Sequence, residues 1–173
     1  MPRVPWAGNG RGTAVHTMGT HVCLETPNIL IGWEDDEGGY LFIRYTHLLS
    51  AQQVRDATPA FLEAVREHHA TRCLSDSRQR RLVQPDAQEA FISAVAAGAA
   101  NGLRRMAVVL PQSVVTQTTL VPLVARYQAH LEAAFFGSME EAMSWLMARA
   151  PQLAEQRLML ADHAAPPEGP IAR

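Results

Sequence analysis

The densest group of chemically useful side chains in the sequence lies in one short polar segment, residues 76–81. It holds an acid, a hydroxyl and three arginines, and the planar guanidinium of arginine binds carboxylate and phosphate groups. The segment follows an apolar stretch typical of a strand and precedes a predicted helix at Pro85. In open parallel sheets, ligands and partners bind where strands end and helices begin. We therefore predict a loop that binds an anion or a partner and is formed by Asp76, Ser77, Arg78, Arg80 and Arg81.

Two other interpretations of this segment stay open. Exposed arginines can simply be solvated and pair with nearby acids such as Asp86 and Glu89, and each such pair contributes about 0 to 1 kcal/mol. Ser77 is also a candidate phosphorylation site, because a phosphate adds a charge of about −1.5 to −2 that neighbouring arginines attract. Attraction between the phosphate and these arginines would then hold the loop in place.

The histidines and the absence of lysine limit the remaining chemistry. The chain has seven histidines, but His68 and His69 are adjacent and so diverge on a helix, while the others show no metal-ligand spacing. We therefore expect no metal and no other cofactor. All 15 basic residues are arginine, which excludes a Schiff-base lysine, a P-loop lysine and a lysine general base.

No catalytic set is visible in the sequence. The phrase Ser75–Ser77 lacks the glycine-flanked elbow of hydrolases, and the acidic run at 34–37 lacks the alternating spacing of a calcium loop. We expect a protein that is not an enzyme. A hydrolase would require the fold to bring Ser77 to hydrogen-bonding distance of a histidine.

Composition indicates the setting in which the protein works. The formal net charge is −2, from 15 basic and 17 acidic side chains, which argues against a protein that wraps nucleic acid. Cys23 and Cys73 are too far apart for a CxxC motif and fit two reduced, buried thiols. No signal-peptide pattern and no run of about 18 apolar residues occurs. We expect a soluble cytoplasmic protein whose translation starts at Met1 or at Met18.

The first half of the chain predicts a β-hairpin followed by a helix. Residues 1–24 lack apolar periodicity and are expected to form a flexible leader. Two apolar runs, NILIGWED and YLFIRYTH, flank a turn that contains glycine, which is typical of a hairpin. Ser50 and Gln53 form a capping box that starts a helix, and Pro59 is expected to kink or divide that helix.

The second half predicts strands that alternate with helices. The apolar runs at 71–76 and 104–110 are typical of strands, and the second is continuous enough to be buried on both faces. The helix between them ends at Gly102. The order ββαβαβαβα predicts an α/β fold with a mixed, mostly parallel sheet of about five strands and helices mainly on one face. The domain is expected at 25–150, with a helical or mobile tail at 151–173.

Three phrases of the sequence resemble a known superfamily. They are CLSDSRQRRLVQPDAQEAF at 73–91, GLRRMAVVLPQSVVTQ at 102–117 and AAFFGSMEEAMSWL at 133–146. In order and spacing they are similar to the STAS-like superfamily, which includes the anti-sigma-factor antagonists and small lipid-transfer-like bacterial proteins of unassigned role. Together with the hairpin and the first helix, the similarity covers residues 28–150 and implies a STAS-like sandwich.

The resemblance also implies a non-catalytic binding or signalling module. In the anti-sigma-factor antagonists, the loop after the matching strand carries an aspartate, two serines and a glycine, and one serine is a phosphorylation switch. The corresponding stretch here is Asp76-Ser77-Arg78-Gln79. Ser77 alone matches that pattern, and the second serine and the glycine are missing.

From these observations we predict a cytoplasmic protein-interaction or signalling module that uses the loop 76–81 and the following helix as its recognition surface. The alternative is a small-molecule or lipid-binding module of the same fold. A protein partner is expected, whereas nucleic acid and a membrane span are not. The small residues of the helix at 86–101 also suggest a surface for a homodimer.

Overall fold

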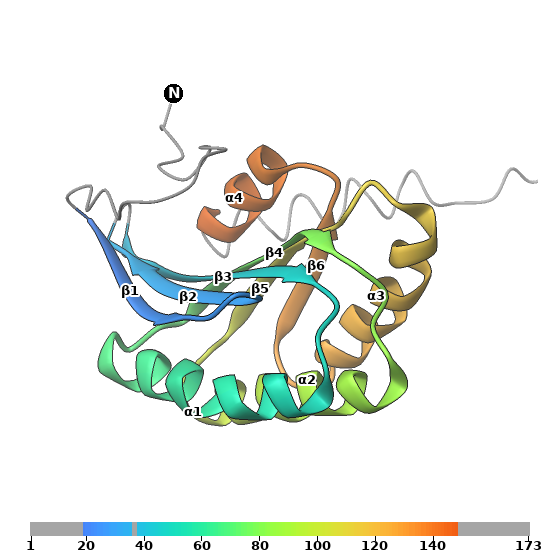
Figure 1. Cartoon of the computed structure of the whole chain (residues 1–173). Coiled ribbons are helices and arrows are strands. Elements are labelled where there is room, and N and C mark those ends of the chain that lie inside the picture. The colour runs from blue at the N-terminus through green and yellow to red at the C-terminus, as the bar shows by residue number, and fades with distance from the viewer. Residues whose placement is uncertain (1–18, 36–37, 149–173) are drawn as a thin grey trace, which may run out of the picture.

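The computed structural model describes residues 19–35 and 38–148 of the chain. They form three consecutive strands and then helices that alternate with strands (Figure 1). In chain order the elements are β1 (Thr20–Glu25), β2 (Ile29–Glu34), β3 (Tyr40–His47), α1 (Ala51–Glu67), β4 (Arg72–Arg80), α2 (Pro85–Ala100), β5 (Arg105–Val109), α3 (Val114–Tyr127), β6 (Glu132–Phe136) and α4 (Met139–Met147). Most of the predicted leader and all of the predicted tail at 151–173 lie outside the described residues.

The strands form one mixed sheet in which spatial order follows chain order, from β1 to β6. The pairs β1–β2 and β2–β3 are antiparallel, and the pairs β3–β4, β4–β5 and β5–β6 are parallel. The predicted hairpin is confirmed as β2 and β3. β5 lies between β4 and β6, inside the sheet, as its continuous apolar run indicated. The α/β class is confirmed, with a six-stranded sheet.

The sequence did not predict β1, which lies almost entirely within the range 1–24 that was expected to be a leader. None of its side chains is fully buried, so the strand lacks the alternation of apolar and polar residues by which strands are recognised. β1 pairs with β2 and occupies the edge of the sheet. The antiparallel edge of the sheet is therefore formed by β1 and not by the hairpin of β2 and β3.

Helices cover the two faces of the sheet unequally. The larger apolar cluster packs residues such as Phe61 of α1, Phe91 of α2 and Leu123 of α3 against one face, and the smaller cluster packs Leu146 of α4 against the other. Of the four described helices, Figure 1 shows only α4 on that side of the sheet. Helices mainly on one face were predicted, and this is confirmed.

α1 begins as predicted but is not divided by its proline. The Ser50 hydroxyl accepts a hydrogen bond from the Gln53 backbone N–H (3.2 Å), and the Gln53 side chain accepts one from the Ser50 backbone N–H (2.9 Å). The helix continues through Pro59 to Glu67. Pro59 has no backbone N–H, so the carbonyl of Arg55 has no hydrogen-bond donor at the position where a helix normally provides one. Arg55 is exposed, so water can serve as the donor and the helix continues.

The small residues of α2 serve packing within the domain. A Cβ atom added at Gly98 would lie 2.9 Å from the Phe61 ring of α1. Glycine therefore allows the two helices to approach each other at this point. A homodimer through this helix stays a prediction.

Candidate functional site

The segment predicted as the recognition loop is mostly strand. β4 continues to Arg80, and its last residues pair with the end of β3. Backbone pairing with β3 does not require apolar side chains, so the polar sequence concealed the strand, and the expectation of a free loop at 76–81 is wrong. Of the five predicted site residues, three are buried, namely Asp76, Ser77 and Arg80. The other two, Arg78 and Arg81, are exposed.

The buried carboxylate of Asp76 is paired with two arginines. Arg78 donates to it from Nε (2.9 Å), from Nη2 (3.1 Å) and from its backbone N–H (3.2 Å). Arg44 of β3 forms an ion pair with the same carboxylate at 3.6 Å. Glu89, which the sequence suggested as a partner for these arginines, pairs instead with Arg126 of α3.

Ser77 is fully buried, with 0 % of its surface exposed. Its hydroxyl has no hydrogen-bond partner among the described residues. A kinase could reach Ser77 only if β4 opened first. The serine–histidine hydrogen bond that a hydrolase would need is likewise not formed by Ser77 in the described part of the chain.

A β-bulge places Arg80 on the face that α1, α2 and α3 cover. β3 and β4 pair at Arg44↔Asp76 and next at Thr46↔Gln79, so β4 contains one extra residue there. An extra residue reverses the alternation of faces along a strand. As a result the Arg80 side chain packs over Phe91 of the larger apolar cluster.

Arg80 is buried, and the described residues provide it with no anionic partner. It is 6 % exposed, and its guanidinium carbon lies 3.9 Å from the ring centroid of Phe91 and 4.9 Å from that of Tyr45. Its Nη2 has no hydrogen-bond partner, and none of the ion pairs within residues 19–35 and 38–148 includes Arg80. Burial lowers the pKa of the guanidinium, while the nearby Tyr127 and Tyr45 raise it. A buried cation of this kind is costly and favours binding of an anion or water.

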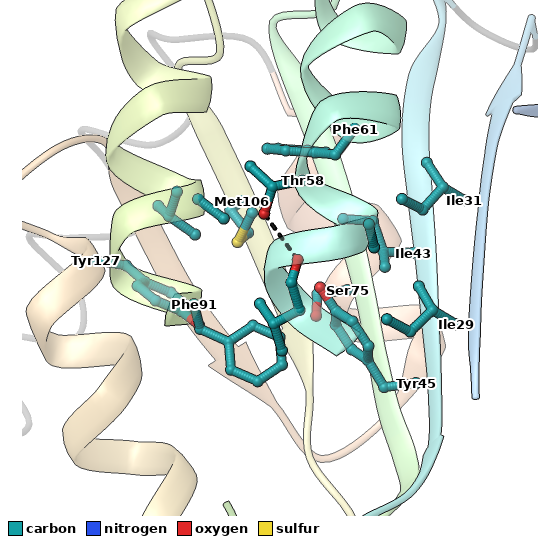
Figure 2. Close-up of a pocket in the computed structure, with 14 residues that line it drawn as sticks. Ile29, Ile31, Ile43, Tyr45, Thr58, Phe61, Ser75, Phe91, Met106 and Tyr127 are labelled. Carbon is teal, nitrogen blue, oxygen red and sulfur yellow. Dashed lines mark hydrogen bonds between the residues drawn. The ribbon is translucent and has the colours of Figure 1, made fainter. Parts of the chain in front are cut away.

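A small cavity adjoins the aromatic residues that contact Arg80 (Figure 2). Its volume is about 30 Å³, which is room for a water molecule or two. Four hydroxyl-bearing residues line it, namely Tyr45 of β3, Thr58 of α1, Ser75 of β4 and Tyr127 of α3. The Thr58 hydroxyl donates to the carbonyl of Val54 (2.8 Å), the dashed line in Figure 2. The cavity is thus mostly apolar, with a few hydroxyl groups.

A group of exposed apolar side chains follows the carboxyl ends of three parallel strands. We call it the carboxyl-end patch, and its members are Leu48 after β3, Leu82 after β4, and Val114 and Val115 at the start of α3, after β5. The valines are 71 % and 63 % exposed. The segments that follow these strands leave the sheet at the same end (Figure 1), and the Arg81 backbone N–H donates to the carbonyl of His47 (3.0 Å). The exposed cation Arg81 is adjacent to Leu82 in the chain.

Three side chains able to bind a metal meet between β1 and α1. The ligand atoms of His21, Cys23 and His68 all lie within 4.8 Å of one another. The sequence showed no ligand spacing because the fold alone brings the end of α1 beside β1.

A model of the SpoIIAA-like family matches residues 40–147, which is more than half of the chain. The chain belongs to the SpoIIAA-like family. The match runs from β3 to α4 and confirms the predicted STAS-like resemblance. No curated protein matches the chain.

Two solved structures are similar to this SpoIIAA-like chain. One is an uncharacterized protein from the DUF3478 family with a SpoIIAA-like fold from Shewanella loihica PV-4, at 19 % identity, with 71 % of this chain and 98 % of that chain covered and a TM-score of 0.53. The other is the anti-sigma factor antagonist SpoIIAA in its unphosphorylated form, at 11 % identity, with 75 % and 99 % covered and a TM-score of 0.46. At 19 % identity, the likeness to the first of these structures shows the fold alone.

The SpoIIAA-like domain has two features that the sequence interpretation missed, one on its surface and one buried. The carboxyl-end patch lies at or beside the ends of predicted elements, where apolar residues carried no periodic signal. Arg80 was grouped with Arg78 and Arg81, and only the bulge distinguishes its surroundings from theirs. None of the helices in the described residues is long and apolar enough to cross a membrane.

Proposed function

We propose that this SpoIIAA-like domain is a non-catalytic protein-interaction module for cytoplasmic signalling, and that it contacts its partner through the carboxyl-end patch. The observation that supports this proposal is the exposure of four large apolar side chains at the end of the sheet where parallel α/β folds bind partners. Full burial of a leucine or valine contributes about 1.5–3 kcal/mol relative to full exposure. The STAS-like resemblance also implies a protein partner.

The chemistry of the patch suggests the kind of partner. Arg81 is an exposed cation next to it, and the amino end of α3 adds a partial positive charge. Arg78 contributes less, because Asp76 already holds it. The partner we expect presents apolar side chains with carboxylates around them.

The test is a double substitution at the start of α3, Val114→Asp with Val115→Asp. Aspartate is favoured in the first turn of a helix, so the domain should stay folded while the apolar contact is lost and an acidic partner is repelled. A matched control is Phe135→Ser, which removes an exposed apolar side chain from β6. Quantitative capture from the host should recover a partner with the wild type and the control, but not with the double variant.

Hydrogen exchange then locates the contact. With the purified partner added, slower exchange is expected in the segments that follow β3 and β4 and at the start of α3. Slower exchange confined to other elements, or equal capture by the double variant, would contradict the proposal.

A second candidate function is supported by Arg80. Its guanidinium, whose Nη2 has no hydrogen-bond partner among the described residues, lies over two aromatic rings that also line the cavity. This arrangement suits a small molecule with an anionic group and an apolar part. The cavity of about 30 Å³ is too small for such a molecule unless Tyr45 and Phe91 move. Native mass spectrometry of the protein from its host should show a retained ligand that the Arg80→Met variant lacks, and a spectrum of bare protein in both cases would contradict this function.

A further inference from the structure

The end of α1 and the edge strand β1 bring together two imidazoles and one thiol. His21 and Cys23 belong to β1, and His68 caps the end of α1. The ligand atoms of all three lie within 4.8 Å of one another, and the Cys23 sulfur is 3.8 Å from His21 Nδ1. In a tetrahedral zinc site, sulfur and nitrogen ligands at about 2.3 and 2.0 Å from the ion are about 3.5 Å apart. The three groups are therefore almost at coordination spacing.

A local irregularity of β1 presents Cys23 to this point. The β1–β2 register shifts between Val22 and Leu24, so Cys23 has no partner residue on β2. A bulge of this kind redirects a side chain that a regular strand would point elsewhere. Cys23 is half-buried as a result, while His21 remains exposed.

His68 is held in place by its neighbours. Its ring stacks on Trp33 of β2, with centroids 4.7 Å apart and planes 7° from parallel. Trp33 is fixed in turn, because its indole N–H donates to Asp35 and a Cβ at Gly39 would overlap its ring. His68 Nε2 is buried and has no hydrogen-bond partner in the described part of the chain. The domain thus orients an imidazole and leaves one nitrogen unused.

The surrounding charge favours a cation at this position. Glu63 and Glu67 lie on α1, and their negative charges act on the position of Cys23. Negative charges nearby attract a divalent cation. The charge of a bound ion in turn deprotonates a coordinating thiol.

We propose that His21, Cys23 and His68 bind one zinc ion, with the fourth coordination position open to water. Two imidazoles and one thiolate are ligands that zinc prefers, and zinc held by three protein ligands with water in the fourth position is a known coordination in proteins. On binding, the sulfur–hydrogen bond of Cys23 is replaced by a zinc–sulfur bond, and the proton passes to the solvent. The ion would join β1 to the end of α1, independently of the carboxyl-end patch and Arg80.

Cobalt and zinc binding to the metal-free, full-length protein tests the proposal. Cobalt should give a thiolate charge-transfer band at one ion per chain, and zinc should abolish it. Cys23→Ser should remove the band, and His21→Gln or His68→Gln should weaken zinc binding at least about 10–100-fold. His130→Gln, at an exposed histidine of another segment, should change neither. Absence of the band, or equal zinc affinity in all variants, overturns the proposal.

A second measurement uses the unaltered protein and so does not depend on how the variants fold. Cys73 is fully buried, and burial raises the pKa of its thiol, so alkylation by iodoacetamide should be confined to Cys23. Zinc should slow alkylation of Cys23 at least about tenfold, and a chelator should restore the rate. An alkylation rate that zinc leaves unchanged overturns the proposal.

Discussion

The two charged residues that β4 buries, Asp76 and Arg80, have opposite surroundings. Asp76 follows Leu74 on the face that α4 covers and receives hydrogen bonds from Arg78 and an ion pair from Arg44. Arg80 lies on the other face, over two aromatic rings, and its Nη2 has no hydrogen-bond partner within residues 19–35 and 38–148. The same strand therefore carries one buried charge with charged partners and one for which the described residues provide none.

The difference indicates what each residue is for. Removing a carboxylate that several donors share leaves those donors without an acceptor, so Asp76 should matter to stability. For a buried cation without a partner, no ionic attraction offsets the free energy of desolvation. A protein with an apolar residue of similar shape at that position is often at least as stable. Arg80 is thus hard to explain by stability, which is why we connect it with binding.

The largest effect is expected for Asp76→Ala. The three hydrogen bonds from Arg78 lose their acceptor and the like charges of Arg44 and Arg78 remain, so the free energy of unfolding should fall by about 2–3 kcal/mol. Chemical denaturation measures this change. Asp76→Asn keeps one acceptor oxygen and should lose less; an equal, negligible loss in both variants would remove the contrast with Arg80.

Arg80→Met should leave the free energy of unfolding unchanged or raise it by about 1 kcal/mol, because the apolar chain keeps its contacts with Phe91 and Tyr45 while the buried charge disappears. Arg80→Ala is the control and should be less stable than Arg80→Met, since it leaves a void. Thermal and denaturant unfolding both report these changes. A loss for Arg80→Met as large as that for Asp76→Ala would show that Arg80 is as well paired as Asp76.

The exposed arginines should differ from each other. Arg78→Ala should cost about 1 kcal/mol of unfolding free energy, because it removes donors from Asp76. Arg81→Ala should change it by less than about 0.5 kcal/mol, as is usual for an exposed side chain. Denaturation of both variants under the same conditions measures the difference, and equal values would mean that the Arg78–Asp76 contacts contribute nothing.

The smallest effect on stability is expected for the surface pair Glu89–Arg126. The hydrogen bond from Arg126 lowers the pKa of Glu89 below its ordinary value of 4.5. The small contribution of this pair to the free energy of unfolding is therefore fully present at a pH above the ordinary pKa of Glu89. It is lost as the pH falls through the lowered pKa of the folded protein. An NMR titration should show the lowered pKa, and Arg126→Gln should return it towards 4.5. An unchanged Glu89 titration in that variant would mean that the pair does not form in solution.

Elements with strong local signals could be predicted from the sequence. The run RMAVVL before Pro111 marked an interior strand, and the capping box at Ser50 marked the start of α1. β1 could not be predicted, because an edge strand with no fully buried residue has no apolar pattern. The end of β4 was missed for a similar reason, since its pairing with β3 is made by the backbone.

The candidate sites depended on tertiary structure more than the fold did. The predicted segment 76–81 contains Arg80, but its burial follows from a bulge that no local pattern reveals. His68 and the pair His21 and Cys23 lie on different elements, so sequence spacing could not connect them. The sequence identified the segment where the charges lie, and the register of the strands decided which of them face the interior.

The order of the strands has a consequence for how the chain is made. Because spatial order follows chain order from β1 to β6, each strand pairs with the one synthesised just before it. No strand has to insert between two that are already paired, so the sheet can grow by addition at one end as the nascent chain lengthens, amino-terminal part first. Each parallel pair from β3 to β6 is then separated in the chain by a single helical crossover.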